Sequence, residues 1–347
     1  MNSPVSNALT SAIQKLAFHQ PLSAANTEEA FDVVMRGQAS EVQVGALLAA
    51  MRAVGETSEM VAGVVRALRS AMIVLPARDP DSLVDTCGTG GGVVPTFNIS
   101  TAAALVAAGA GVRIAKHGNR SFTTRCGSAD VLQALGMEIE VPIEVMAKTL
   151  EATGLVFMFA PLMHPAMRHV GPVRRELGIP TVMNIVGPLA NPAKAGAQVV
   201  GVSDRDRAPI LADALVSLGS RHALVVHGEP GLDEISPLGL THVTEVRGGK
   251  TSQWVIDPAK LGFGKGKESD LAGGGPEDNA RIIEEILENR GREAAKAAVI
   301  LNAAGAIYVG GLSKNFPDAV SLAQRSLETG SAKKALQNLG SAYRKAS

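Results

Sequence analysis

Three short segments of the chain concentrate glycine, hydroxyl, basic and acidic side chains. Residues 85–101 read DTCGTGGGVVPTFNIST, with four glycines in five positions followed by polar residues. Residues 115–130 read AKHGNRSFTTRCGSAD and combine basic residues with several hydroxyls. Residues 227–236 read HGEPGLDEIS and hold two adjacent carboxylates, Asp233 and Glu234. Glycine lets the backbone approach a ligand, basic and hydroxyl side chains bind phosphate oxygens, and paired carboxylates bind hard cations such as Mg²⁺.

The glycine-rich segment lies between a strand-like run, LVDTC, and a helix-like run, ISTAAALVAAG. A helix N-terminus presents unpaired N–H groups that suit an anion. The pattern is not Gly-x-Gly-x-x-Gly, because Val93 occupies the place of the last glycine, and no Gly-Lys-Ser/Thr of a Walker loop follows. Alone, the segment is equally typical of a tight turn. The polar side chains of Asn98, Ser100 and Thr101 favour a phosphate or a metal-bound ligand.

The other two segments also follow strand-like runs. AKHGNR comes directly after VRI, and the acidic pair comes after HALVVH. Taken alone, the basic segment is also compatible with a solvated charged turn, and the acidic pair with an ordinary acidic turn. The carboxyl ends of parallel strands meet at one edge of a sheet, so we expect the three loops to form one site there. Their meeting would favour an anion site with a bound metal.

Two zones of different pattern predict the architecture. Residues 1–75 contain mostly helix signals, such as a helix that begins at Ser40 with Gln43 at capping-box spacing and ends at Gly55. Beyond a proline-containing linker, short apolar runs alternate with helical periods, which is typical of α/β proteins. We therefore predict an α/β protein with a small all-helical N-terminal domain, residues 1–75, and a larger domain, residues 82–347. Helices flank a mostly parallel central sheet in the larger domain.

The composition excludes several classes of protein. Lysine plus arginine and aspartate plus glutamate both number 33, so no overall positive charge would attract nucleic acid or an anionic membrane. Two cysteines, Cys87 and Cys126, exclude a disulfide framework and a four-cysteine zinc site, and they are typical of a reducing compartment. The N-terminal stretch lacks a basic segment followed by an apolar core. We therefore expect a cytoplasmic protein with no secretory signal and no membrane span.

The segments GTGG and TFNIST, followed by KHGNR and GSAD, resemble those of anthranilate phosphoribosyltransferases. HPAMRHVGPVRRELGIPT, NIVGPLANPA, HGEPGLDEIS and LAGGGPEDNA agree, so the resemblance runs in order over nearly the whole chain. It implies a fold of the nucleoside phosphorylase/phosphoribosyltransferase type, with a helical segment near residues 165–190 joined to the small domain, and a homodimer formed through the helical part. It also implies transfer of the phosphoribosyl group of 5-phosphoribosyl 1-pyrophosphate (PRPP) to anthranilate in tryptophan biosynthesis, giving N-(5-phosphoribosyl)anthranilate and pyrophosphate.

The resemblance implies three sets of site residues. The expected PRPP contacts are Gly88, Gly91, Gly92, Thr96, Asn98, Ile99, Ser100, Thr101, Lys116, His117, Gly118, Asn119, Arg120, Ser121, Phe122, Thr123, Thr124 and Ser128. The expected anthranilate contacts are Gly88, Asn119 and Arg174. The expected ligands of Mg²⁺, with two ions per monomer, are Ser100, Asp233 and Glu234.

Binding of anthranilate requires a cation that pairs with its carboxylate and a wall of side chains that pack against its ring. A guanidinium pairs with a carboxylate in bidentate geometry, but helical periodicity does not decide between Arg174 and its neighbour Arg175. His117, His164 and Pro188 are further candidates for the wall. No side-chain general base is assigned, because the difficult step is breaking the bond from ribose C1 to pyrophosphate.

One residue departs from the family pattern, and two rival functions remain open. Gly92 stands where the family usually has aspartate, so we expect catalysis to persist with a different magnesium dependence. A pyrimidine nucleoside phosphorylase would lack the paired metal carboxylates. A catalytically silent relative that binds nucleic acid would carry a basic excess and a damaged substrate loop. A glutamine amidotransferase partner is neither indicated nor excluded by the sequence.

Overall fold

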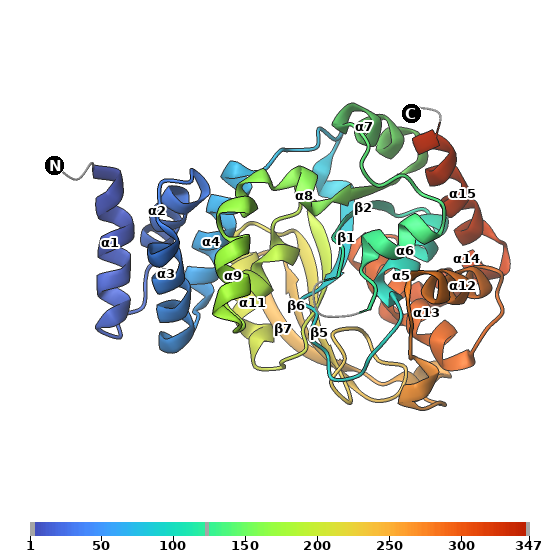
Figure 1. Cartoon of the computed structure of the whole chain (residues 1–347). Helices are drawn as coiled ribbons and strands as arrows, with labels where there is room; N and C mark the ends of the chain where they lie inside the picture. The colour runs from blue at the N-terminus through green and yellow to red at the C-terminus, as the bar shows by residue number, and fades with distance from the viewer. Residues whose placement is uncertain (1–3, 122–124, 345–347) are drawn as a thin grey trace.

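The computed structural model describes residues 4–121 and 125–344, which form a helical bundle and a larger α/β part (Figure 1). Phe122, Thr123 and Thr124 of the predicted PRPP loop lie outside the described residues. The helices are α1 Pro4–Ala17, α2 Ala24–Met35, α3 Glu41–Val54, α4 Ser58–Ala71, α5 Ile99–Gly109, α6 Ser128–Ala134, α7 Ile143–Thr153, α8 Ala160–Met163, α9 Gly171–Leu177, α10 Met183–Val186, α11 Arg207–Ser217, α12 Pro276–Leu287, α13 Glu293–Val309, α14 Phe316–Glu328 and α15 Ser331–Arg344, with the 3-10 helices η2 Pro165–His169 and η3 Gly187–Leu189. The strands are β1 Leu83–Gly88, β2 Arg113–Gly118, β3 Leu155–Phe159, β4 Ala197–Gly201, β5 His222–Gly228, β6 Thr241–Arg247 and β7 Lys250–Ile256.

The described strands form one sheet in the order β3-β2-β1-β4-β5-β6-β7. Strands β1 to β5 are parallel, whereas β6 is antiparallel to both β5 and β7. The predicted α/β fold with a mostly parallel sheet is confirmed. The chain runs outward from β1 to β3 and then returns to β4, which lies on the other side of β1. In sheets of this kind a crevice opens at the carboxyl ends of the strands where the order reverses.

The antiparallel strands β6 and β7 are the part of the sheet that the alternation of apolar runs does not predict. Strand β7 is exposed along most of its length, so its sequence, KTSQWVI, lacks the apolar run of a buried parallel strand. Gly248 and Gly249 join it to β6 with positive φ angles of 57° and 75°, which fit a tight hairpin turn.

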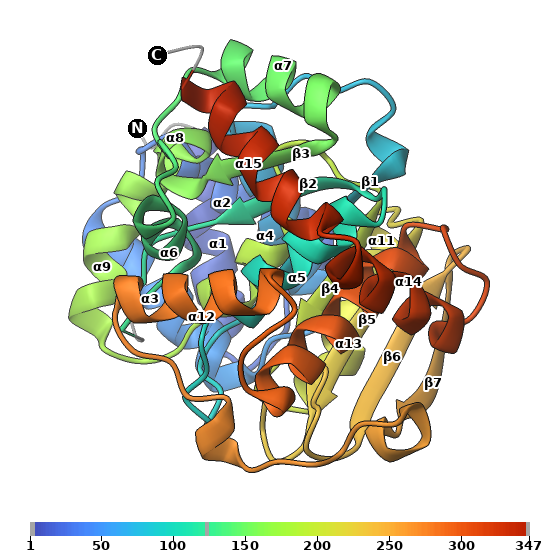
Figure 2. The same ribbon diagram turned by 90° about the vertical axis from the view of Figure 1, so that its right-hand side faces the viewer.

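Two hydrophobic cores hold the molecule together. In the first, α5 packs on β1 and β2 while α13 packs on β4, and Figure 2 shows α13 in front of the strands. The second joins β4 and β5 to α11 and to the helical bundle, α1 to α4, with α4 against α11. The segment near residues 165–190 contributes Val173 and Val182 to this second core. Its helix α9 packs on α3, and η2 packs on α2.

The predicted helix after Ser40 is confirmed as α3. Ser40 Oγ accepts a hydrogen bond from the Gln43 amide at 3.3 Å, and the Gln43 side chain accepts one from the Ser40 amide at 3.0 Å. This capping box satisfies two of the free groups at the helix N-terminus. Gly55 follows the last turn with a φ of 94°, a backbone conformation that favours glycine.

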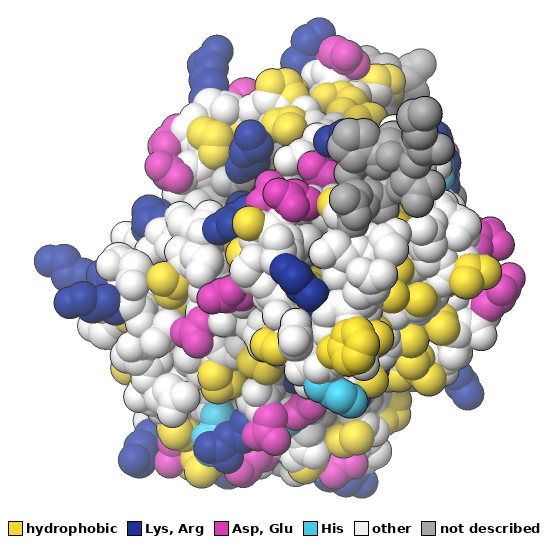
Figure 3. Space-filling model, turned by 90° about the vertical axis from the view of Figure 1, so that its left-hand side faces the viewer, with side chains coloured by type: hydrophobic (Ala, Val, Ile, Leu, Met, Phe, Trp, Pro, Cys, Tyr) yellow, Lys and Arg dark blue, Asp and Glu magenta, His cyan; other side chains and the backbone are white. Residues whose placement is uncertain are grey.

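The outer face of the bundle, on the side away from the sheet, is partly apolar (Figure 3). Phe18, which follows α1, is 78% exposed, and Val42 at the start of α3 is 81% exposed. Within the described ranges, no helix combines the length and apolar character needed to cross a membrane.

Candidate active site

The loops that follow β1, β4 and β5 meet at the carboxyl edge of the sheet, where the strand order reverses. The Thr89 amide donates to the Gly201 carbonyl at 2.8 Å, which joins the glycine-rich loop to the end of β4. The Gly90 amide donates to Asp233 Oδ2 at 2.9 Å, which joins the same loop to the acidic segment after β5. The expected meeting of the glycine-rich and acidic segments is therefore observed.

Asp233 lies inside the curve of the glycine-rich loop. A Cβ atom at Gly88 would lie 2.5 Å from Asp233 Oδ2, and one at Gly92 would lie 3.1 Å from Asp233 Oδ1. Gly88 is therefore required for this close approach, since no side chain fits between the loop and the carboxylate. Burial raises the pKa of Asp233, although the hydrogen bond from the Gly90 amide opposes the shift.

Glu234 contacts the N-terminus of α5 next to a buried lysine. The Ser100 amide donates to Glu234 Oε1 at 3.1 Å, and Lys116 Nζ donates to Ser100 Oγ at 3.3 Å and to the Thr86 carbonyl. Burial first, and the charge of Asp233 second, raise the pKa of Glu234 to about 8, while Lys116 opposes this shift. The two carboxylates thus destabilise each other's charge when no cation lies between them.

These residues fit a hard divalent cation. Two adjacent carboxylates with raised pKa values and the hydroxyl of Ser100 are oxygen ligands of the kind that Mg²⁺ prefers. No third His, Cys, Asp or Glu side chain joins them anywhere in the described part of the chain. A cation here would therefore take the rest of its coordination from water or from ligand oxygens, as Mg²⁺ commonly does beside phosphates.

The second predicted loop folds around the N-terminus of α6. Asp130 Oδ1 pairs with Arg120 Nη1 at 2.9 Å, and Asp130 Oδ2 accepts from the amides of Ser121 at 3.1 Å and Gly127 at 2.8 Å. Burial alone would raise the pKa of Asp130, but these three donors bring it below its ordinary value. The Ser128 hydroxyl lies 3.2 Å from the Asn119 amide. The sequence analysis missed Asp130, whose signal is its place three residues after Gly127 at a helix start.

Asp85, within β1, is a second supporting residue that the sequence analysis missed. Its oxygens accept from the His117 amide at 3.1 Å and from Asn191 Nδ2 at 2.7 Å, and Asn191 also donates to the Ala115 carbonyl at 2.9 Å. Burial raises the pKa of Asp85, and Lys116 is the largest opposing influence. An acidic residue inside an apolar strand was the available signal, because buried charges need partners.

Several of the predicted PRPP residues have side chains that are bonded to, or buried against, other parts of the protein. Only their backbone groups are left to face the site. Asn98 donates to the Cys126 carbonyl at 3.1 Å and accepts from Asn279 Nδ2 at 2.9 Å, so its side chain links the loop before α6 to helix α12. The side chains of Ile99 and Thr101 are buried in the first turn of α5. Asn279, a third missed residue, also accepts from the Gly274 amide at 2.7 Å.

On the acceptor side, the structure separates the two neighbouring arginines. Arg174 is partly buried, and its Nη2 lies 3.5 Å from Asn184 Oδ1, whereas Arg175 is exposed. Burial lowers the pKa of Arg174. The structure therefore distinguishes Arg174 from Arg175 by its burial and by its contact with Asn184.

Two histidines, the partly buried His117 and the buried His164, lie side by side near these segments. The ring centroids of His117 and His164 are 5.0 Å apart, and both Nε2 atoms are buried without a hydrogen-bond partner among the described residues. Burial, then His164 and Lys116, lower the pKa of His117 to about 3, and burial lowers that of His164 to about 4. Both imidazoles are therefore neutral near pH 7.

Comparison with known proteins decides the family. Residues 10–72 match the helical bundle domain of the glycosyl transferase family, and residues 80–333 match its a/b domain. Anthranilate phosphoribosyltransferase from Rubrobacter xylanophilus is 46% identical over 329 residues, which cover 95% of this chain and 96% of that protein. The crystal structure of anthranilate phosphoribosyltransferase from Thermus thermophilus is 39% identical, with a TM-score of 0.91 over 96% of this chain and 99% of that one. The chain belongs to the anthranilate phosphoribosyltransferase family.

A further member of the anthranilate phosphoribosyltransferase family carries ligands. The enzyme from Saccharomyces cerevisiae, in complex with PRPP and Mg, is 29% identical, with a TM-score of 0.88 over 97% of this chain and 98% of that one. Family membership shows that this chain is an enzyme that transfers a pentosyl group. It favours the phosphoribosyltransferase function over the rival function of a nucleoside phosphorylase.

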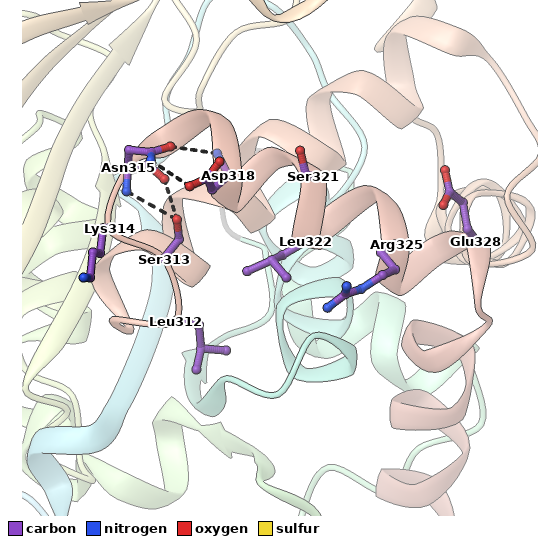
Figure 4. Close-up of a pocket in the computed structure, with 9 residues that line it drawn as sticks. All are labelled: Leu312, Ser313, Lys314, Asn315, Asp318, Ser321, Leu322, Arg325 and Glu328. Atoms are coloured by element: carbon purple, nitrogen blue, oxygen red, sulfur yellow. Dashed lines mark hydrogen bonds between the residues drawn. The ribbon is translucent and has the colours of Figure 1, made fainter.

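A separate hollow of about 620 Å³ lies on α14, and we do not place the active site there. Figure 4 shows that its residues come from α14 and the segment before it. Its lining residues are Leu312, Ser313, Lys314, Asn315, Asp318, Ser321, Leu322, Arg325 and Glu328. Ser326 of α14 donates to the Val106 carbonyl, near the C-terminal end of α5. The hollow is therefore at the opposite end of α5 from Ser100.

The buried histidines predict how stability depends on pH. Their folded-state pKa values, about 3 and about 4, lie below the ordinary 6.5, so below pH 6.5 the unfolded chain takes up protons that the folded chain does not. We expect the free energy of unfolding to fall as pH falls from 6.5 towards 4, by up to about 1.4 kcal/mol per pH unit for each histidine. Urea denaturation at several pH values measures this slope.

Substitutions distinguish these histidines from other titrating groups. His117→Asn and His164→Asn should each flatten the slope, whereas His19→Asn, at an exposed position, should leave it unchanged. An unaltered slope in both buried-site variants would contradict the assignment.

Proposed function

We propose that the loops after β1, β2 and β5 bind PRPP and magnesium, and that α9 presents Arg174 to the carboxylate of anthranilate. The enzyme transfers the phosphoribosyl group of PRPP to anthranilate, giving N-(5-phosphoribosyl)anthranilate and pyrophosphate, in tryptophan biosynthesis. One observation carries the site assignment. Asp233 and Glu234 bond to the Gly90 and Ser100 amides, which places both carboxylates against the glycine-rich loop and the start of α5.

The proposed PRPP site is lined by basic side chains, by backbone amides and by acidic side chains. Lys116 is buried beside Ser100, and Arg120 is held by Asp130 in the next loop. The amides at the start of α5 add the partial positive charge of a helix N-terminus. Together these groups favour the negative charge that grows on pyrophosphate as its bond to C1 breaks.

Ser100, Asp233 and Glu234 would hold magnesium, with two ions per monomer. The related yeast structure contains Mg together with PRPP, which supports the use of this metal. When bound, Mg²⁺ neutralises charge on the pyrophosphate oxygens. The chain's own contribution is the pair of carboxylates, which the Gly90 and Ser100 amides hold in place before the ligands arrive.

Anthranilate binds between Arg174 and the loop after β2. Arg174 pairs with its carboxylate, and Asn119 and Gly88 border the ring and the amine. His117, His164 and Pro188 form the wall. The neutral imidazoles do not protonate the amine near pH 7, because their pKa values are about 3 and about 4. The amine therefore stays nucleophilic, and no side-chain general base is needed.

A fluorescence assay tests the proposed function. Purified protein is mixed with anthranilate, PRPP and magnesium, and the fluorescence of anthranilate is followed. We expect it to fall only when all three components are present. A signal that stays constant at every magnesium concentration would overturn the proposal, and phosphorolysis of thymidine or uridine would then favour the rival phosphorylase.

Gly92 predicts an unusual magnesium dependence. A Cβ at this position would lie 3.1 Å from Asp233 Oδ1, so Gly92→Asp adds a third carboxylate beside the metal ligands after a small adjustment. One further charge at this range contributes on the order of 1.4 kcal/mol, which is about tenfold in affinity. We expect Gly92→Asp to lower the half-saturating magnesium concentration about tenfold while turnover persists. Superimposable magnesium titrations of the two proteins would contradict this, and Gly92→Asn controls for the added bulk.

We propose that the enzyme is a cytoplasmic homodimer formed through the outer face of the helical bundle. Phe18, which follows α1, and Val42, at the start of α3, are exposed and would be covered by the second copy. We further propose that the domains divide at residues 1–75 and 82–347, with the segment near residues 165–190 belonging to the helical part. The packing of α9 on α3 supports that division.

A further inference from the structure

We propose that a buried ion pair between Glu56 and Arg207 positions the acceptor side of this enzyme relative to its donor side. The inference rests on the proposed role of Arg174. Glu56 lies between α3 and α4 in the helical bundle, whereas Arg207 is the first residue of α11 in the α/β part. Arg207 Nη1 lies 3.1 Å from Glu56 Oε2, so the pair joins the two parts directly.

The pair is sheltered from solvent. The Glu56 side chain is 3% exposed and that of Arg207 is 17% exposed. Arg52 also reaches Glu56 Oε2, at 3.4 Å, but its side chain is 42% exposed and belongs to α3, so this contact stays within the bundle. Exposed ion pairs contribute little to the free energy of unfolding, whereas removal of the buried partner of a buried carboxylate is strongly destabilising. Glu56 Oε1 has no hydrogen-bond partner within the described structure, which increases the dependence of Glu56 on Arg207.

Arg207 directly follows a loop that borders the PRPP site. This loop, residues 202–206, follows β4, and the last residue of that strand, Gly201, accepts from the Thr89 amide. Ser203 Oγ would lie 3.7 Å from a Cβ at Gly91. The loop that leads to Arg207 therefore lies next to the glycine-rich loop, which fixes Arg207 relative to the donor side.

Glu56 is connected to the support of Arg174 through α3. Helix α3 ends at Val54, two residues before Glu56, and α9 packs on α3. A Cβ at Gly45 of α3 would lie 3.6 Å from Val173, the residue that precedes Arg174. The position of α3 therefore determines where Arg174 stands.

A further link between the two parts lies further along α4. Arg66 Nη2 lies 3.3 Å from the carbonyl of Ser217, the last residue of α11. Within the helical part, Arg69 donates twice to the Leu189 carbonyl, at 3.0 and 2.7 Å, and so holds the segment near residues 165–190 against α4. Loss of the Glu56–Arg207 pair would leave these contacts in place. We therefore expect the bundle to tilt about the Arg66–Ser217 contact rather than to detach, which moves Arg174 and leaves the PRPP loops intact.

The test measures the KM values of both substrates in a double variant, Glu56→Gln/Arg207→Met, which leaves no unpaired buried charge. A small displacement of a substrate-positioning group reduces productive binding strongly. We expect KM for anthranilate to rise about tenfold, while KM for PRPP and the melting temperature stay close to those of the unaltered protein. The single variant Arg207→Lys keeps a cation facing Glu56, so its KM for anthranilate should stay close to that of the unaltered protein.

Arg52→Gln is the matched control, because it removes the exposed partner of the same carboxylate, and we expect it to change neither KM. An unchanged anthranilate KM in the folded double variant, or equal rises of both KM values, would overturn the inference. Arg174→Met is measured alongside. If it leaves the anthranilate KM unchanged, the proposed acceptor site fails and the inference with it. If it raises that KM while the double variant does not, only the ion-pair inference fails.

Discussion

Asp233→Asn together with Glu234→Gln is expected to lower kcat/KM for phosphoribosyl transfer at saturating magnesium about a thousandfold, or about 4 kcal/mol of transition-state stabilisation. The substitutions remove the two negative charges that hold the cation. They keep the oxygens that accept from the Gly90 and Ser100 amides, so the loops should retain their conformation. Initial rates from anthranilate fluorescence measure the effect.

The same variant has a readout that does not depend on activity. Burial raises the pKa of both carboxylates, and the Asp233 charge adds to the rise at Glu234, so removing the charges relieves an unfavourable interaction. We expect the metal-free variant to melt no lower than the unaltered protein. Magnesium should raise the melting temperature of the unaltered protein and leave the variant unchanged.

The matched control is another pair of adjacent acidic residues, Glu277→Gln with Asp278→Asn on α12. Asp278 is exposed and pairs with Arg281 on the same helix. This control should keep both the activity and the response to magnesium. A variant at Asp233 and Glu234 that kept a tenth or more of the activity would show that these carboxylates do not hold the essential cation.

The sequence predicts the parallel part of the fold because each strand there is buried on both faces. Such strands appear as short apolar runs, LVDTC and HALVVH among them, that contrast with the helices around them. Strand β7 has no such signal, because one face of this edge strand meets solvent. The loops that carry the chemistry are predictable for a related reason, since glycine and charge directly after a buried strand are unusual.

The residues that support those loops are harder to predict because their partners are distant in the chain. Asn191 bonds to Asp85 across 106 positions, and Asn279 bonds to Asn98 across 181. Neither pairing leaves a pattern in local sequence. The position of Gly92 beside Asp233 is of the same kind. The resemblance to the family identifies the departure, and only the folded chain shows that a side chain there would meet Asp233, the proposed metal ligand.

The choice between Arg174 and Arg175 is a further question that helical periodicity leaves open. Both residues follow Val173, which is buried in the second core, and neither shares its face of α9, so the apolar pattern does not say which one meets the acceptor. The structure distinguishes them by burial, since Arg174 is partly buried next to Asn184 and Arg175 is exposed. A partly buried guanidinium forms a stronger pair with a carboxylate than an exposed one does.

Arg174→Met is therefore expected to raise KM for anthranilate about fiftyfold, the loss of a charge-assisted hydrogen-bonded pair of about 2.3 kcal/mol. KM for PRPP should stay within about twofold, because the PRPP loops lie on the α/β part and keep their own contacts. Arg175→Met, one position further along the same helix, should match the unaltered protein in both constants. Arg174→Lys keeps the charge but loses the planar fork, so we expect an intermediate KM. Equal effects of the two methionine variants would mean that α9 supplies only positive charge to the acceptor and no defined pairing.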